Sequence, residues 1–267
     1  MNLWVGLVCL FPEMVSAIAS AGILGRAIRR GEMGLEAFNP RDHASDRRRT
    51  VDDRPYGGGP GMVMMAEPLL GAIGEARQRA PSPPRVVYLS PQGARLHQSG
   101  VERLARLRSL VLVAGRYEGI DERVIELAVD EELSIGDYIL SGGELPAMVL
   151  VDALCRLLPG ALNNEESIQT ESLLDGLLEY PQYTRPERVG PLPVPAVLLG
   201  GDHGAVRRWR RTEALLRTWR RRPDLLTSRT LSAADSALLK AGLLAAGLPP
   251  KPRAEALGPN RAGIQGE

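Results

Sequence analysis

Three short stretches rich in glycine and serine each follow an apolar run, and they are the first candidates for a ligand site. They read Ser90-Pro-Gln-Gly93, Ala114-Gly-Arg116 and Ser134-Ile-Gly-Asp137. Residues of this kind let the main chain approach a ligand closely and read its edge with N–H and C=O groups. If the apolar runs are strands of one parallel sheet, the three stretches meet at one edge, where open α/β sheets bind ligands.

A fourth stretch, residues 46–61, resembles a phosphate-binding loop in its glycine content. It reads Asp-Arg-Arg-Arg-Thr-Val-Asp-Asp-Arg-Pro-Tyr-Gly-Gly-Gly-Pro-Gly. It lacks the Gly-Lys-Ser/Thr ending of a Walker motif, and no Gly-x-Gly-x-x-Gly follows a strand pattern. Nucleoside triphosphatases and dinucleotide-binding enzymes are therefore disfavoured. A loop this long is either functional or a plain surface loop, and both readings stay open.

The charges of the chain are segregated, although its formal net charge is only +1. Residues 203–222 hold eight arginines against Glu213, and residues 116–132 hold seven acids against Arg116 and Arg123. Arginine suits phosphate recognition, and a segregated field can steer a charged ligand. The alternative is that each run is a solvated face.

Cysteine and histidine supply no metal site or disulfide framework. Cys9 and Cys155 both lie in apolar surroundings, and His43, His97 and His203 are far apart. We therefore expect buried thiols, a reducing cytoplasmic location and no bound metal cluster. The apolar N-terminus has no preceding basic residue and no small-residue cleavage site, and no apolar stretch suits a membrane span.

The elements that must position the ligand stretches alternate between strands and helices. The predicted strands are Leu3–Leu10, Leu35–Phe38, Val86–Leu89, Leu110–Val113 and a short run near Leu133. The predicted helices are Glu13–Ala19, Ile23–Arg30, Glu67–Ala80, Ser99–Leu107, Asp121–Ala128 and Glu144–Leu158. This alternation predicts an α/β fold with a mainly parallel sheet and helices on both faces.

The arginine-rich run is itself predicted to be a helix. Asp202 suits its N-cap and Pro223 its end, and a last helix over 233–246 would be capped by Ser232. Its apolar residues, Val206, Trp209, Leu216 and Trp219, recur at helical spacing. That spacing favours core packing for both tryptophans over a role as stacking platforms for nucleic-acid bases.

Six stretches together resemble the bacterial tRNA (guanine-37-N1)-methyltransferases, of TrmD type in the SPOUT class. They are Arg47–Met62, Tyr88–Gly93, Val113–Val124, Ser134–Ala147, Tyr183-Thr-Arg-Pro186 and Arg207-Arg-Trp-Arg210, and the resemblance covers about residues 1–226. It implies a C-terminal trefoil knot on the α/β sheet and a small helical C-terminal domain. The implied ranges are 1–162 for the catalytic domain, 163–175 for a flexible linker, 176–247 for the tRNA-binding domain and 248–267 for a disordered tail.

The resemblance also implies S-adenosylmethionine as methyl donor and a pocket for it. The residues carried over are Tyr88, Leu89, Ser90, Gly115, Ile135, Gly136, Asp137, Tyr138, Ile139, Leu140 and Pro146. Ordinary strand-to-helix turns are the alternative interpretation of these residues when the family is left aside.

For catalysis the family uses a linker aspartate as base and an arginine on the preceding helix. Matched residue by residue, the arginine is Arg156, but the aspartate position holds Glu171. Glutamate keeps the carboxylate and lengthens its arm by one methylene, and Asp175 is the rival base. Arg156 could alternatively pair with Asp152, four residues earlier on the helix.

The implied partner is tRNA with guanine at position 37, and no membrane or DNA is expected. The expected contacts are Arg54, Arg207, Arg208, Arg210 and Arg211. The family further implies a homodimer whose sites draw on both chains, and Mg²⁺ held loosely with substrate oxygens. Two rivals remain: a SPOUT-class RNA methyltransferase with another target atom, and a non-catalytic RNA-binding protein.

Overall fold

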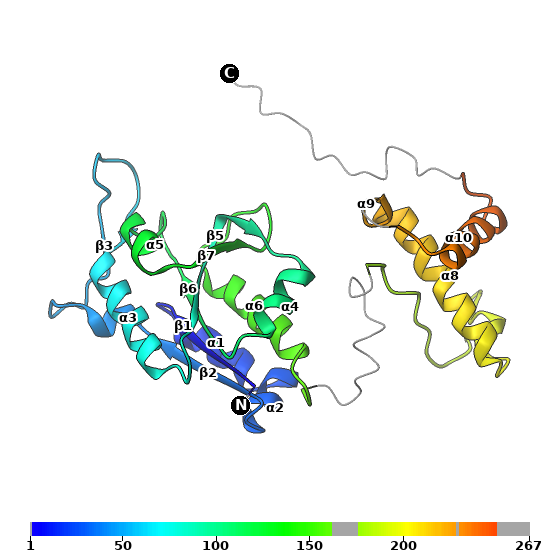
Figure 1. The fold of residues 1–267 in the computed structure, drawn as a ribbon, viewed down its shortest axis with the longest axis horizontal. Helices are drawn as coiled ribbons and strands as arrows, with labels where there is room; N and C mark the ends of the chain where they lie inside the picture. Colours follow the sequence, from blue (N-terminus) through cyan, green and yellow to red (C-terminus); the bar gives the residue numbers. More distant parts are fainter. Residues whose placement is uncertain (1, 162–175, 228–229, 250–267) are drawn as a thin grey trace, which may run out of the picture. The chain divides into compact units, whose positions relative to one another are not determined.

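The chain forms two compact units that divide between Glu165 and Glu166. The structure, a computed structural model, describes residues 2–161, 176–227 and 230–249. Each unit is considered by itself (Figure 1). The predicted linker 163–175 and the tail from residue 250 onward lie outside the described residues.

Unit 1 is built on a five-stranded sheet in the order β2-β1-β6-β5-β7. The strands are β1 (Leu3–Val8), β2 (Met33–Phe38), β5 (Arg85–Arg95), β6 (Ser109–Ala114) and β7 (Glu131–Ser134). Every pairing in this sheet is parallel, so the predicted mainly parallel sheet is confirmed. The carboxyl ends of β5, β6 and β7 therefore lie side by side.

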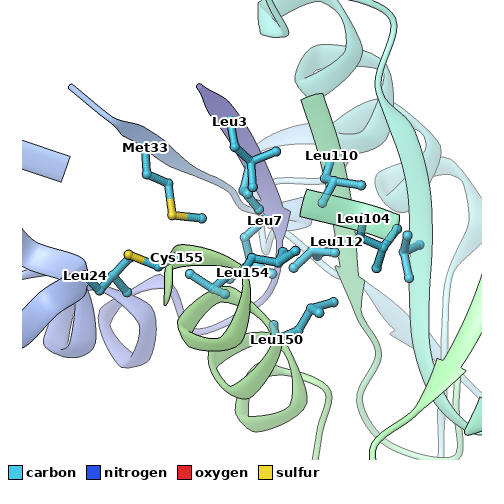
Figure 2. Packing of buried hydrophobic residues seen from close by; sticks show 14 of the residues in the cluster. Leu3, Leu7, Leu24, Met33, Leu104, Leu110, Leu112, Leu150, Leu154 and Cys155 are labelled. Atoms are coloured by element: carbon cyan, nitrogen blue, oxygen red, sulfur yellow. The ribbon is translucent and has the colours of Figure 1, made fainter. Parts of the chain in front are cut away.

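Four helices cover one face of the sheet: α1 (Pro12–Ala19), α2 (Gly22–Arg29), α4 (Gln98–Ala105) and α6 (Glu144–Arg156). All six residues of β1 are buried, and Leu3 and Leu7 point to this face. They pack with Leu150 and Leu154 of α6 (Figure 2). An apolar strand without polar alternation is typical of a parallel sheet that is covered on both sides.

The other face is covered by α3 (Ala66–Arg79) and α5 (Glu122–Ala128) (Figure 1). Trp4 and Val8, the alternate residues of β1, belong to this second cluster, and the Trp4 ring lies 6.1 Å from that of Phe38. Two separate apolar clusters on one sheet confirm the prediction of helices on both faces.

Two stretches predicted as irregular contain regular structure. The segment 39–65 holds a 3-10 helix η1 (Pro40–His43) and a hairpin of β3 (Asp52–Asp53) with β4 (Val63–Met64). The predicted turn at 90–93 is wrong in part, because β5 continues through it to Arg95. β5 pairs with β7 on both sides of an irregularity between Leu89 and Ala94, which sequence periodicity does not reveal.

Unit 2 is mainly helical, with α8 (His203–Arg221), α9 (Pro223–Thr227), α10 (Ala233–Ala245), a 3-10 helix η2 (Ala196–Leu198) and a hairpin of β8 (Arg188–Val189) with β9 (Leu192–Pro193). Both predicted caps are confirmed. The Asp202 carboxylate accepts from the Ala205 N–H at 2.9 Å, and Ser232 Oγ accepts from the Asp235 N–H at 3.0 Å. Pro223 ends α8 and begins α9.

The core of unit 2 lies where α8 meets α10 and the chain before β8. Leu215 is fully buried, and Leu216, Trp219 and Leu243 form a second cluster. Core packing is thereby confirmed for Trp219.

Nowhere in the described ranges is a helix both long enough and apolar enough to cross a lipid bilayer.

Both thiols of the chain should be unreactive in the folded protein. Burial raises the pKa of Cys9 to about 12 and that of Cys155 to about 11, so neither forms a thiolate at pH 8. Ellman's reagent should therefore release no thionitrobenzoate from native protein, and two equivalents per chain after unfolding in guanidinium chloride. Rapid release of one equivalent from native protein would contradict the packing described here.

Candidate functional site

A cavity of about 320 Å³ opens at the carboxyl ends of β5, β6 and β7. Its walls bring together ten of the eleven residues that were predicted to bind the methyl donor, namely Tyr88, Leu89, Ser90, Gly115, Ile135, Gly136, Tyr138, Ile139, Leu140 and Pro146. The eleventh, Asp137, does not line it. Its carboxylate is exposed and lies 3.6 Å from the guanidinium of Arg95. The three glycine- and serine-rich stretches thus meet, as parallel strands require.

The walls of this cavity pass one another at main-chain contact distance. The Gly143 N–H donates to the Gly115 carbonyl at 2.8 Å. A Cβ added at Gly143 would lie 2.6 Å from the Ala114 Cα, and one at Gly93 would lie 2.4 Å from main-chain atoms of Glu132 and Leu133. Only glycine fits such crossings, because a Cβ has no room between two backbones.

Gly115 likewise has no room for a side chain. A Cβ there would lie 2.8 Å from the hydroxyl of Tyr88, which belongs to β5. Burial, and then the charge of Glu132, raises the pKa of Tyr88 and keeps its phenol neutral. The Ser134 hydroxyl shapes the next turn: it accepts from the Gly136 N–H at 3.2 Å and donates to the Gly136 carbonyl at 3.1 Å.

One edge of the cavity exposes consecutive apolar side chains. The exposed fractions are 54% for Tyr138, 85% for Ile139 and 38% for Leu140. Three such residues in a row on the rim of a cavity form an uncovered apolar surface, which a flat apolar ligand would cover.

A buried ion pair holds the loop that follows β7. Glu144, the first residue of α6, is fully buried, and its Oε2 accepts from Arg116 Nε at 2.9 Å. The same guanidinium donates to the Ser141 carbonyl at 3.3 Å and lies 4.4 Å from the centroid of the Phe11 ring. Glu144 Oε1 is buried without a hydrogen-bond partner among the described residues. Arg116 thereby contacts both the start of α6 and Phe11, the residue that precedes α1.

The predicted tRNA-contacting loop docks beside the cavity. The Glu118 N–H donates to the Met62 carbonyl, and the Met64 N–H donates to the Gly119 carbonyl, each at 3.0 Å. Arg54 lies between β3 and β4 and is exposed. The long loop is therefore fastened at its base to the cavity wall, while its tip is in solvent.

The cavity is also lined by acidic residues, which were not among the predicted site residues. Glu118, Glu122 and Glu132 are among them, and Arg116, the cation of the wall, is already paired with Glu144. The signal was the acidic run 116–132, whose place on the cavity could not be read without the fold. The cavity is consequently electronegative and suits a cationic ligand.

Of the predicted catalytic residues, only Arg156 lies within the described part of the chain. Arg156 is the last residue of α6 and is half-buried, but it is not among the cavity residues. It lies about 15 Å along the helix axis from Pro146, at 1.5 Å per residue. Glu171 and its rival Asp175 lie outside the described residues.

The predicted tRNA contacts of α8 divide into two kinds. Arg207, Arg208 and Arg210 are exposed. Arg211 is half-buried, and its guanidinium makes two hydrogen bonds to the Asp235 carboxylate of α10, both 2.8 Å long.

Within the described part of the chain no three His, Cys, Asp or Glu side chains cluster closely enough to hold a metal ion.

Comparison with known proteins gives one consistent result. The family model described as tRNA (Guanine-1)-methyltransferase TrmD matches residues 3–228. A tRNA (guanine-N(1)-)-methyltransferase of Pseudomonas paraeruginosa is 59% identical over 239 residues, which are 89% of this chain and 95% of the relative. Proteins of the same name from Tolumonas auensis and Pseudoalteromonas translucida are 56% and 55% identical over 89% of this chain, and over 95% and 93% of their own lengths.

Replacement of Gly143 by alanine should destabilise unit 1 by about 2 kcal/mol, because the new Cβ overlaps the main chain of β6. Gly143 has ordinary helical φ and ψ, so the cost is steric and not conformational. The matched control is Gly74→Ala in α3, where a Cβ meets nothing within 4 Å. That change should stabilise by about 0.5–1 kcal/mol. Urea unfolding of both variants measures the difference, and equal midpoints would show that the crossing is loose.

Proposed function

The chain belongs to the tRNA (guanine-1)-methyltransferase family, and from that premise we propose that it transfers a methyl group from S-adenosylmethionine to N1 of guanine 37 in tRNA. One observation carries the assignment of the site. The family's motifs, scattered over residues 88–146, line a single electronegative cavity at the carboxyl ends of three parallel strands.

The cavity fits S-adenosylmethionine in shape and in charge. The glycines at 115, 136 and 143 leave main-chain groups exposed to read the adenine edge, and the apolar rim of Tyr138, Ile139 and Leu140 would cover the ring. When bound, this cofactor supplies a methyl group on a positively charged sulfur. Glu118, Glu122 and Glu132 favour that charge. We assign binding to all eleven predicted residues, with Asp137 at the rim.

We further propose that the segment after β7 forms the trefoil knot of the SPOUT class. Two features support this topology. β5 pairs with β7 both before and after its irregularity, and the chain then returns so that Gly142 pairs with Arg116 and Gly143 with Gly115. The glycines at these crossings are what a chain threaded through a tight loop requires.

The reaction needs a base, because guanine N1 carries a proton and is a poor nucleophile. In our proposal the Glu171 carboxylate takes that proton as N1 bonds to the methyl carbon and the carbon–sulfur bond breaks. The negative charge that spreads to the exocyclic oxygen of guanine is stabilised by the Arg156 guanidinium. The guanine must leave the stack of the anticodon loop to reach them.

The position of Arg156 supports a homodimer as the active unit. Its backbone is about 15 Å along α6 from Pro146, at the end of the helix remote from the cavity. A second copy of the chain would supply the catalytic arginine and the linker carboxylate to each cavity. Mg²⁺, if the reaction uses it, would bind largely through substrate oxygens, because the described residues offer no metal cluster.

Unit 2 is proposed as the tRNA-binding domain, together with the loop that carries Arg54. Arg207, Arg208 and Arg210 are exposed and would contact phosphates. Arg211 would contact the tRNA while it remains bonded to Asp235. The corresponding domain ranges are 1–162 and 176–247.

Methylation of tRNA transcripts that differ only at position 37 tests the proposal. Label from the methyl donor should enter the guanine-37 transcript as 1-methylguanosine and should be absent from the adenine-37 transcript. A labelled ribose would favour a SPOUT enzyme with another target atom. Binding of tRNA without heat on titration with S-adenosylhomocysteine would favour a non-catalytic RNA-binding protein.

Glu171→Gln should lower turnover by about a hundredfold or more, because the amide cannot accept the N1 proton. Binding of S-adenosylhomocysteine, measured by calorimetry, should be unchanged. Asp175→Asn is the matched control, four residues further along the same segment. If Asp175→Asn abolishes turnover and Glu171→Gln does not, the assignment of the base is wrong.

A further inference from the structure

Unit 2 contains a cavity of its own that the proposed reaction leaves without a role. Its volume is about 410 Å³, within the roughly 300–1,000 Å³ of small-molecule sites. It lies between the chain at 180–187, the residues around η2 and the first half of α8. The lining residues on which the argument depends are Tyr180, Tyr183, Arg185, Glu187, Trp209 and Arg210.

The aromatic side of this cavity is accessible to a ligand. The rings of Tyr183 and Trp209 have centroids 6.3 Å apart and are tilted by 51°. Tyr183 is 49% exposed and Trp209 is half-buried, whereas Trp219 is only 7% exposed in the core. The expectation that both tryptophans pack in a core therefore holds for Trp219, while Trp209 lines a cavity.

The lining of the cavity also carries positive charge. Arg185 and Arg210 line it, and Glu187 is the single acid among its lining residues. The Arg210 guanidinium lies over the Tyr180 ring, 4.9 Å from its centroid, and the Arg210 side chain is exposed. Arg207 and Arg208 extend the positive charge along the exposed face of α8.

We propose that this cavity holds one unpaired nucleotide of the bound tRNA, in addition to the guanine that is methylated. Its base stacks on Trp209 and Tyr183, and its phosphate contacts Arg185 and Arg210. Aromatic surfaces beside guanidinium groups are the means by which proteins bind single-stranded RNA, whereas a protein partner would not require the concentration of arginine. The inference rests on the proposed function, because it takes tRNA as the substrate.

The test compares Trp209→Leu, Trp209→Phe and Arg220→Gln in the full-length chain. Arg220 is exposed on the same helix and is not among the residues that line the cavity. Binding of a guanine-37 tRNA transcript is measured from 50 to 200 mM salt, and tryptophan emission is recorded in the same titration.

Trp209→Leu should weaken tRNA binding about tenfold at every salt concentration, which is about 1.4 kcal/mol. Trp209→Phe should retain most of the affinity, since phenylalanine still stacks. Arg220→Gln should lose less than threefold in affinity at 200 mM salt, because Arg220 does not line the cavity; a loss as large as that of Trp209→Leu would contradict the inference. Tryptophan emission of the wild type should be quenched by tRNA, and the quenching should be lost in Trp209→Phe.

Three further results would overturn the inference. The first is wild-type affinity for tRNA in Trp209→Leu, and the second is quenching by tRNA that persists in Trp209→Phe. The third is quenching that depends on protein concentration in the absence of RNA, which would indicate that a second copy of the chain occupies the cavity. If Trp209→Leu unfolds unit 2, Tyr183→Ala replaces it, because that ring is half exposed, and a loss of about fivefold is expected. A wild-type chain that binds no tRNA refutes the proposed function instead, so the two failures are distinguishable.

Discussion

Main-chain segments pass each other at two places near the carboxyl ends of β5, β6 and β7 with no room for a side chain between them, and the cavity of unit 1 depends on those two contacts. Gly143 lies against Ala114, and Gly93 lies against the backbone of β7. The strands that end there are parallel, and close-packed apolar clusters cover them on both faces. The cavity is thus held open by the same packing that stabilises the fold.

The Arg116–Glu144 pair shows what this arrangement costs. Burying two charges is expensive unless each is well paired, and Glu144 Oε1 has no hydrogen-bond partner among the described residues. The pair lies where the segment Ser141-Gly-Gly143 would otherwise have few side-chain contacts to fix it. A guanidinium that donates to both the Ser141 carbonyl and Glu144 orients that loop, and the main-chain groups facing the cavity are oriented with it.

Local pattern was sufficient to predict most of unit 1, whereas contacts between distant segments were not predictable. The spacing of apolar residues, together with the turn residues, identified every strand of the main sheet. The N-caps at Asp202 and Ser232 were predicted from side-chain chemistry alone. The passage of β5 beyond Leu89 was missed, because glycine and proline normally end a strand and only the pairing with β7 continues it. Helical spacing likewise cannot distinguish Trp209 from Trp219, since the cavity that the former lines is made by residues 180–199.

The net charge of +1 conceals two segments of opposite charge, and this segregation suits the two substrates of the proposed reaction. In the proposed reaction, a sulfonium ligand would be attracted to the cavity lined by Glu118, Glu122 and Glu132, where the lining Arg116 is neutralised by Glu144. RNA would be repelled by such a surface and attracted to the exposed arginines of α8. A chain that handles a cation and a polyanion in one reaction can therefore be nearly neutral overall, provided that its sequence keeps the two kinds of charge in separate segments, as the runs 116–132 and 203–222 do.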